Sequence, residues 1–67
     1  MAWREELRYS IDVFDVRDNL VQVRARLDTL DAAIGAYDVY LRLPREPGHV
    51  LMIRQKARAL RRSDRPT

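Results

Sequence analysis

The sequence contains no cysteine and only one histidine among its 67 residues. Disulfide bonds are therefore excluded, and so is a metal site built from cysteine and histidine. The core of so short a chain supplies only about 3–5 kcal/mol unless something else supports it. The support that remains is association of the chain with itself or with another protein.

Long hydrophobic runs are also missing, because the longest is Val50-Leu51-Met52-Ile53. A membrane-spanning helix needs about 18 consecutive apolar residues. The first residues of the chain do not form the apolar segment of a signal peptide. We therefore expect a cytoplasmic protein that has no membrane partner.

Catalytic motifs are absent as well. His49 stands alone, with no residue nearby in the sequence that would orient it as a general base. Asp12, Asp15 and Asp18 are spaced around a helix and lack the glycine and glutamate of a calcium loop, so they indicate a solvated face. Two glycines cannot form a glycine-rich phosphate loop. We predict no enzyme activity, no metal, no cofactor and no small-molecule substrate.

The pattern that is present is helical. Apolar residues recur at alternating spacings of three and four, as they do at the a and d positions of a heptad repeat. They are Val13, Val16, Leu20, Val23, Leu27, Leu30, Ile34, Tyr37 and Leu41. This spacing predicts one long helix over residues 15–43.

The rest of the chain fits a single all-α domain, 1–67. Two prolines and a glycine in residues 44–48 predict a turn. A shorter basic helix over 49–62 would fold back on the long helix as a helical hairpin. Residues 2–14 would form a short N-terminal helix or an extension, and 63–67 a tail.

A β-hairpin is the competing interpretation of the N-terminal half. Apolar residues alternate with other residues in two stretches, 9–13 and 21–27, and Arg17-Asp18-Asn19 between them can form a turn. A helix would then begin at Asp28. The sequence leaves this alternative open.

The long helix would need a partner. With Val13 included, residues 13–43 would make a helix about 46 Å long at 1.5 Å per residue, and the shorter helix could cover only half of it. The flanking e positions are Arg17, Arg24, Asp31 and Asp38. In an antiparallel pair of chains these charges meet opposite charges. We therefore expect a homo-oligomeric coiled coil or bundle, or packing of the apolar positions on another protein.

Positive charge is concentrated near the C-terminus. Residues 1–46 carry a net charge of −2, whereas residues 47–67 carry +5, with no acidic residue from Pro47 to Ser63. In a helix, Arg54, Arg58 and Arg61 would lie on one face, with Lys56, Arg62 and Arg65 nearby. Such a row fits the phosphates of DNA or RNA. We predict non-specific nucleic-acid binding; the alternative is a structural or adaptor protein in a larger assembly, such as a phage particle or a multisubunit complex.

Overall fold

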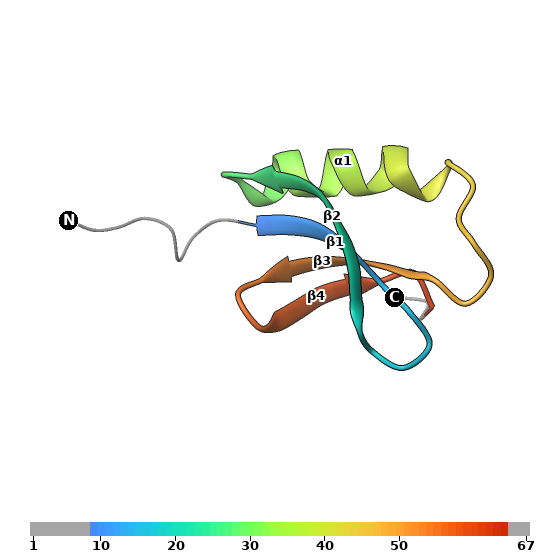
Figure 1. Cartoon of the computed structure of the whole chain (residues 1–67). Helices are drawn as coiled ribbons and strands as arrows, with labels where there is room; N and C mark the ends of the chain where they lie inside the picture. Colours follow the sequence, from blue (N-terminus) through green and yellow to red (C-terminus); the bar gives the residue numbers. More distant parts are fainter. Residues whose placement is uncertain (1–8, 65–67) are drawn as a thin grey trace.

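The computed structural model describes residues 9–64, and these form one antiparallel sheet and one helix. In chain order the elements are β1 (Tyr9–Phe14), β2 (Leu20–Leu27), α1 (Leu30–Leu41), β3 (Val50–Gln55) and β4 (Arg58–Arg62). The strands are ordered β2-β1-β3-β4, and every neighbouring pair is antiparallel. The helix lies along one face of this sheet (Figure 1). Strands β1 and β3 are therefore central, while β2 and β4 are the edges.

The core lies between the two central strands and the helix. Ile11 of β1 and Leu51 and Ile53 of β3 are almost completely buried. They pack against Ala33 and Tyr37 of α1. Burial raises the pKa of the Tyr37 phenol, since the charged form would lose its hydration. Because side chains alternate along a strand, burying these residues under the helix turns their neighbours to the other face.

Within residues 9–64 no helix covers the second face, and we call it the helix-free face. Its members are identified by cross-strand pairing, since directly paired residues share a face. They are Ser10, Asp12 and Phe14 of β1, Leu20, Val23 and Arg26 of β2, Val50, Met52 and Arg54 of β3, and Ala59 and Arg62 of β4.

Local side-chain chemistry determines where the first strands turn. Asp15 Oδ1 accepts hydrogen bonds from the backbone N–H groups of Arg17 and Asn19, each at 2.9 Å. These bonds lower the pKa of the Asp15 carboxyl, with the bond from Asn19 the larger cause. Asp18 then adopts a positive φ of 65°, which aspartate tolerates better than most residues. The β1–β2 turn is therefore specified by the residues within it.

The helix has its own start and stop signals. Thr29 is the N-cap, and its side chain accepts a hydrogen bond from the backbone N–H of Ala32 at 3.1 Å. At the other end Arg45 donates from Nη1 to the carbonyl oxygens of Tyr40 and Leu41, at 3.4 and 3.5 Å. Pro44 directly follows Leu43, and a helix cannot easily continue into a proline. These signals limit the helix to 12 residues.

The all-α prediction is wrong. Residues 9–64 form neither the helical hairpin nor the coiled coil, because 9–27 and 50–62 are β-hairpins. The N-terminal hairpin of the alternative interpretation is present, and a helix does follow it. The heptad positions before Leu30 fall on β1, a turn and β2, so their spacing of three and four is not helical. Of the expected N-terminal helix, residues 9–14 are β1, and the remainder lies outside the described residues.

The predicted second helix is wrong for a physical reason. Val50-Leu51-Met52-Ile53 is a continuous apolar run with two β-branched residues, which suits a strand buried at the centre of a sheet. The following residues Lys56 and Ala57 form a two-residue turn, so the chain reverses into β4. Lys56 takes a positive φ of 57° in this turn. The basic segment is therefore a β-hairpin.

The two glycines allow a test of this fold. Gly48 has a φ of +85°, and a Cβ there would lie 2.7 Å from Cγ1 of Val16. Gly35 lies in α1, and a Cβ there would meet nothing within 4 Å. We expect Gly48→Ala to destabilise the protein by about 2 kcal/mol, through left-handed strain and the contact with Val16. Gly35→Ala should stabilise it by about 0.8–1 kcal/mol, because alanine is the better helix former. Urea unfolding measures both changes, and shifts in the same direction would contradict these placements.

Candidate nucleic-acid interface

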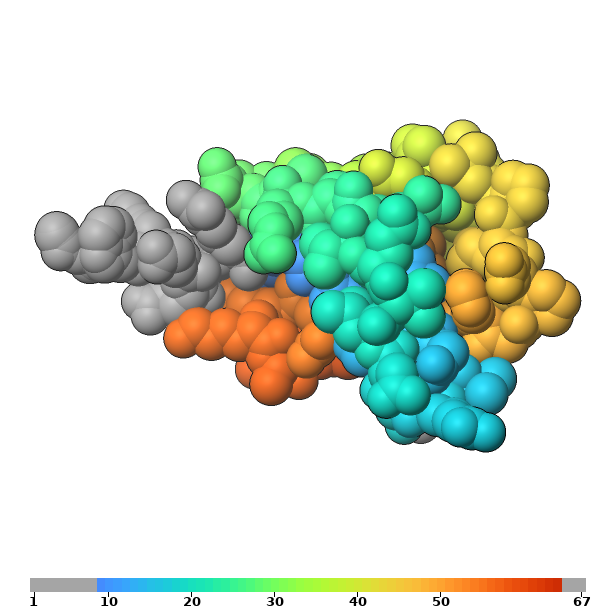
Figure 2. Space-filling model, viewed as in Figure 1, coloured from blue at the N-terminus to red at the C-terminus, as the bar shows by residue number. Residues whose placement is uncertain are grey.

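The β3–β4 hairpin gathers five of the six cations that the sequence analysis selected. Arg54 lies in β3, Lys56 in the turn, and Arg58, Arg61 and Arg62 in β4. The sixth, Arg65, lies outside the described residues. The hairpin turn lies at the surface, where the orange residues are seen in Figure 2.

The expected single row of Arg54, Arg58 and Arg61 is not formed. Arg54 is paired with Ala59, whereas Arg61 is paired with Ile53 and Arg58 with Gln55. A bulge between Ile53 and Arg54 shifts the register. Arg58 and Arg61 consequently lie on the side of the sheet that α1 covers, and Arg54 lies on the helix-free face. The three guanidinium groups are thus divided between two faces.

Two of the cations are held by carboxylates. Arg62 donates from Nε and Nη2 to the two carboxylate oxygens of Asp64, each at 3.0 Å. This paired interaction raises the pKa of the Arg62 guanidinium. Arg54 Nη1 lies 3.5 Å from Asp12 Oδ2. Within residues 9–64, Arg58 and Arg61 have no such ion pair, so their charges are directed to solvent.

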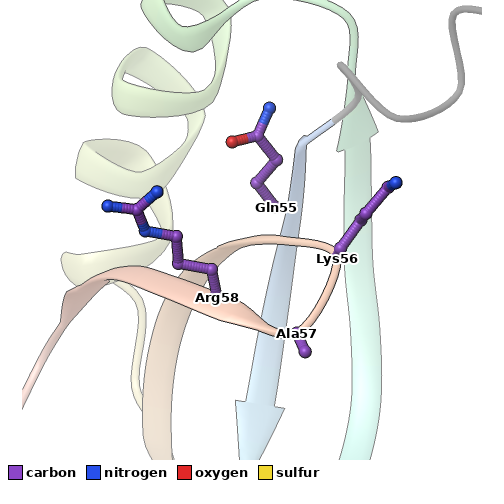
Figure 3. A pocket seen from close by; sticks show the side chains of 4 residues that line it. All are labelled: Gln55, Lys56, Ala57 and Arg58. Atoms are coloured by element: carbon purple, nitrogen blue, oxygen red, sulfur yellow. The ribbon is translucent and has the colours of Figure 1, made fainter.

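Around the turn, Gln55, Lys56, Ala57 and Arg58 line a shallow, open hollow. Figure 3 shows Arg58 extending from the turn toward the side where α1 lies, while Lys56 extends toward the other side. The two cations do not converge on one point. The hollow therefore offers separate contacts to an extended anion and not a closed pocket for a small one.

Asp12, Arg54 and Phe14 form a cluster on the helix-free face. The Arg54 guanidinium carbon lies 5.0 Å from the centroid of the Phe14 ring, within the range of a cation–π contact. The Asp12 side chain is 6% exposed and that of Arg54 is 25% exposed. Asp12 Oδ1 has no hydrogen-bond partner in the described chain. Arg54 is therefore held on one side by a buried carboxylate and on another by an aromatic ring.

Sequence reasoning did not find this cluster. It assigned Asp12 to a solvated face, and the structure buries it. The signal that could have revealed the cluster is the alternation of Ser10, Asp12 and Phe14 on one strand. In β3, Val50, Met52 and Arg54 alternate in the same way. Pairing the two strands antiparallel brings the three cluster residues onto one face.

The predicted partner interface is divided among the elements. Its apolar members are Val13 and Tyr37, which are buried in the core, Val23, Leu27 and Ile34, which are half-buried, and Val16, Leu20, Leu30 and Leu41, which are exposed. Of the charged members, Arg17 lies in the β1–β2 loop, Arg24 on β2, and Asp31 and Asp38 on α1. The Arg24 guanidinium carbon lies 5.3 Å from the Tyr40 ring centroid. These residues do not form one continuous surface.

Other kinds of site have no support in the described part of the chain. No group of three or more metal-ligating side chains occurs in residues 9–64. Nor does that segment contain a helix long and apolar enough to span a membrane. Comparison with protein-family models, with curated proteins and with solved structures finds no match.

The ion pair between Arg54 and Asp12 allows a prediction about the free energy of unfolding. Arg54→Leu would leave the Asp12 carboxylate buried and unpaired, so we expect a loss of about 2–3 kcal/mol in the free energy of unfolding. Asp12→Asn removes the buried charge and should cost less than about 1 kcal/mol. The double variant should recover most of the loss in a urea-unfolding cycle. If the two single losses simply add, the pair does not contribute to stability in this way.

Proposed function

We propose that this protein is a small non-enzymatic module that binds nucleic acid without sequence specificity, through the cations of the β3–β4 hairpin. The observation that carries the proposal is the pair Arg58 and Arg61. Both are exposed on an edge strand and have no ion pair in the described chain. Their partners Ile53 and Gln55 are two residues apart on β3, or about 7 Å, so the two guanidinium groups can contact different phosphates.

The surroundings of this pair support the proposal. No acidic residue occurs from Pro47 to Ser63, so nothing within the hairpin itself repels a phosphate backbone. Lys56 adds positive charge at the turn. Guanidinium groups also donate two parallel hydrogen bonds to one phosphate. Because such contacts go to phosphates and not to base edges, they position the protein without reading sequence.

A second candidate function is an adaptor that packs on another protein or on a second copy of this chain. It is favoured by exposed apolar side chains in the β1–β2 hairpin. Val16 is 78% exposed, Leu20 52% and Val21 48%. Salt separates the two candidates, because phosphate binding weakens steeply as salt rises and apolar packing does not.

The test is the salt dependence of binding to a fluorescent oligonucleotide. The variant is Arg58→Ala with Arg61→Ala, and the control is Arg17→Ala with Arg42→Ala. The control removes the same charge from the β1–β2 loop and the end of α1. Each lost phosphate contact should reduce the slope of log K against log salt by about 0.7 for a single strand or about 0.9 for B-DNA. We expect the first variant to lose two contacts and the control nearly none.

Two results would overturn the proposal. One is a wild-type protein that does not bind the oligonucleotide even at low salt. The other is equal behaviour of the two double variants, which would mean that only net charge matters. Circular dichroism of each variant verifies that the fold is retained.

A further inference from the structure

The helix-free face suggests what form of nucleic acid the protein takes. We infer that the ligand is single-stranded and that one of its bases stacks on the Asp12–Arg54–Phe14 cluster. This inference rests on the proposed function and adds the ligand class and the base contact. The cluster lies on the helix-free face, whereas Arg58 and Arg61 lie on the side of the sheet that α1 covers.

The cluster presents a planar group whose position is already fixed. Arg54 is held 3.5 Å from a carboxylate oxygen of Asp12, and its guanidinium covers the Phe14 ring at 5.0 Å. Its side chain nevertheless remains 25% exposed. Bases stack on guanidinium planes as well as on aromatic rings. Because the group is pre-positioned, little side-chain entropy would be lost when a base binds.

The residues paired with Arg54 across the sheet have small side chains. In the row of paired residues, Arg54 has Ser10 on one side and Ala59 on the other. Neither of these two side chains is large enough to cover the guanidinium, and this favours the approach of a planar ring.

An exposed cation lies near this position on the edge strand β2. Arg26 of β2 is paired with Ser10, and Ser10 is paired with Arg54. Arg26 and Arg54 are thus two strand spacings apart, or about 10 Å. On the other edge Arg62 of β4 is already bound by Asp64. A chain of nucleotides crossing the face can therefore place a phosphate near Arg26 while a base lies on Arg54.

This arrangement favours a single strand over a duplex. In a duplex the bases are stacked on one another and only their edges are accessible. A single strand can turn its bases outward onto protein side chains. Duplex binding would use the phosphate contacts alone and gain nothing from the Phe14 and Arg54 planes.

The experiment compares a short oligothymidine with a DNA duplex of the same length, measured by fluorescence anisotropy. Phe14→Leu removes the ring and keeps an apolar side chain. Arg54→Lys keeps the charge opposite Asp12 and removes the planar group. The matched control is Tyr40→Leu in α1, which removes the aromatic ring that the Arg24 guanidinium contacts. Thermal unfolding of each variant establishes that it is folded.

We expect wild type to bind oligothymidine more tightly than the duplex. Phe14→Leu and Arg54→Lys should each weaken oligothymidine binding about tenfold and leave duplex binding unchanged. Arg54→Lys should do so without changing the salt slope, because the charge remains. Tyr40→Leu should bind both probes as wild type does.

Equal affinity of wild type for the two probes would overturn the inference, and so would unchanged oligothymidine binding by both cluster variants. The proposed function survives either result if Arg58→Ala with Arg61→Ala still lowers the salt slope. If wild type binds neither probe, the proposed function and the inference both fail.

Discussion

A single helix of 12 residues has to cover one face of a four-stranded sheet, and the rest of the structure depends on this constraint. The helix is about 18 Å long and runs along the strands, where a six-residue strand is about 20 Å long (Figure 1). It packs on β1, β2 and β3 and covers the core residues of that face. No other helix lies within residues 9–64, and the second face therefore relies on its own side chains. Ile11, Leu51 and Ile53 form the closed side, while Asp12, Met52 and Arg54 alternate with them on the other.

The placement of Asp12 shows how the second face is stabilised without a covering layer. A carboxylate on a central strand would be costly if it were buried alone. Arg54 offsets that cost from the neighbouring strand and covers Phe14 with its guanidinium plane. Long cationic side chains can cover apolar surface in this way and keep part of the charged group in water. The Arg54–Asp12 ion pair and the Arg54–Phe14 contact thus stabilise this face in place of a second apolar core. The Arg54 guanidinium remains partly exposed.

The fold could be predicted from the sequence only in part. Alternation in residues 9–13 and 21–27, together with the polar residues between them, indicated the β1–β2 hairpin that is observed. The heptad pattern competed with it, because the three-and-four spacing happens to continue from Val13 to Leu41 through both strands and the helix. Only the positions from Leu30 onward belong to a helix. The helix caps would have separated the helical positions from the strand positions, since Thr29 is an N-cap and Pro44 stops the helix. The cations of the hairpin were selected from the sequence, but their distribution over the two faces could not be predicted, because a bulge brings Arg58 and Arg61 to one face and leaves Arg54 on the other.

The two edges of the sheet are protected by different means, and this difference bears on function. Strand β2 has eight residues and two register shifts against β1, which bend an edge and hinder strand addition. Strand β4 has five residues, three of which are arginine. Charge on a short edge strand also discourages pairing with another chain, and any cation would serve that purpose. Phosphate binding has a stricter requirement, since it needs cations that carboxylates do not already neutralise. Arg62 is bound by Asp64, whereas Arg58 and Arg61 have no such partner in the described chain. Edge protection alone does not require that freedom, whereas the proposed phosphate contacts do.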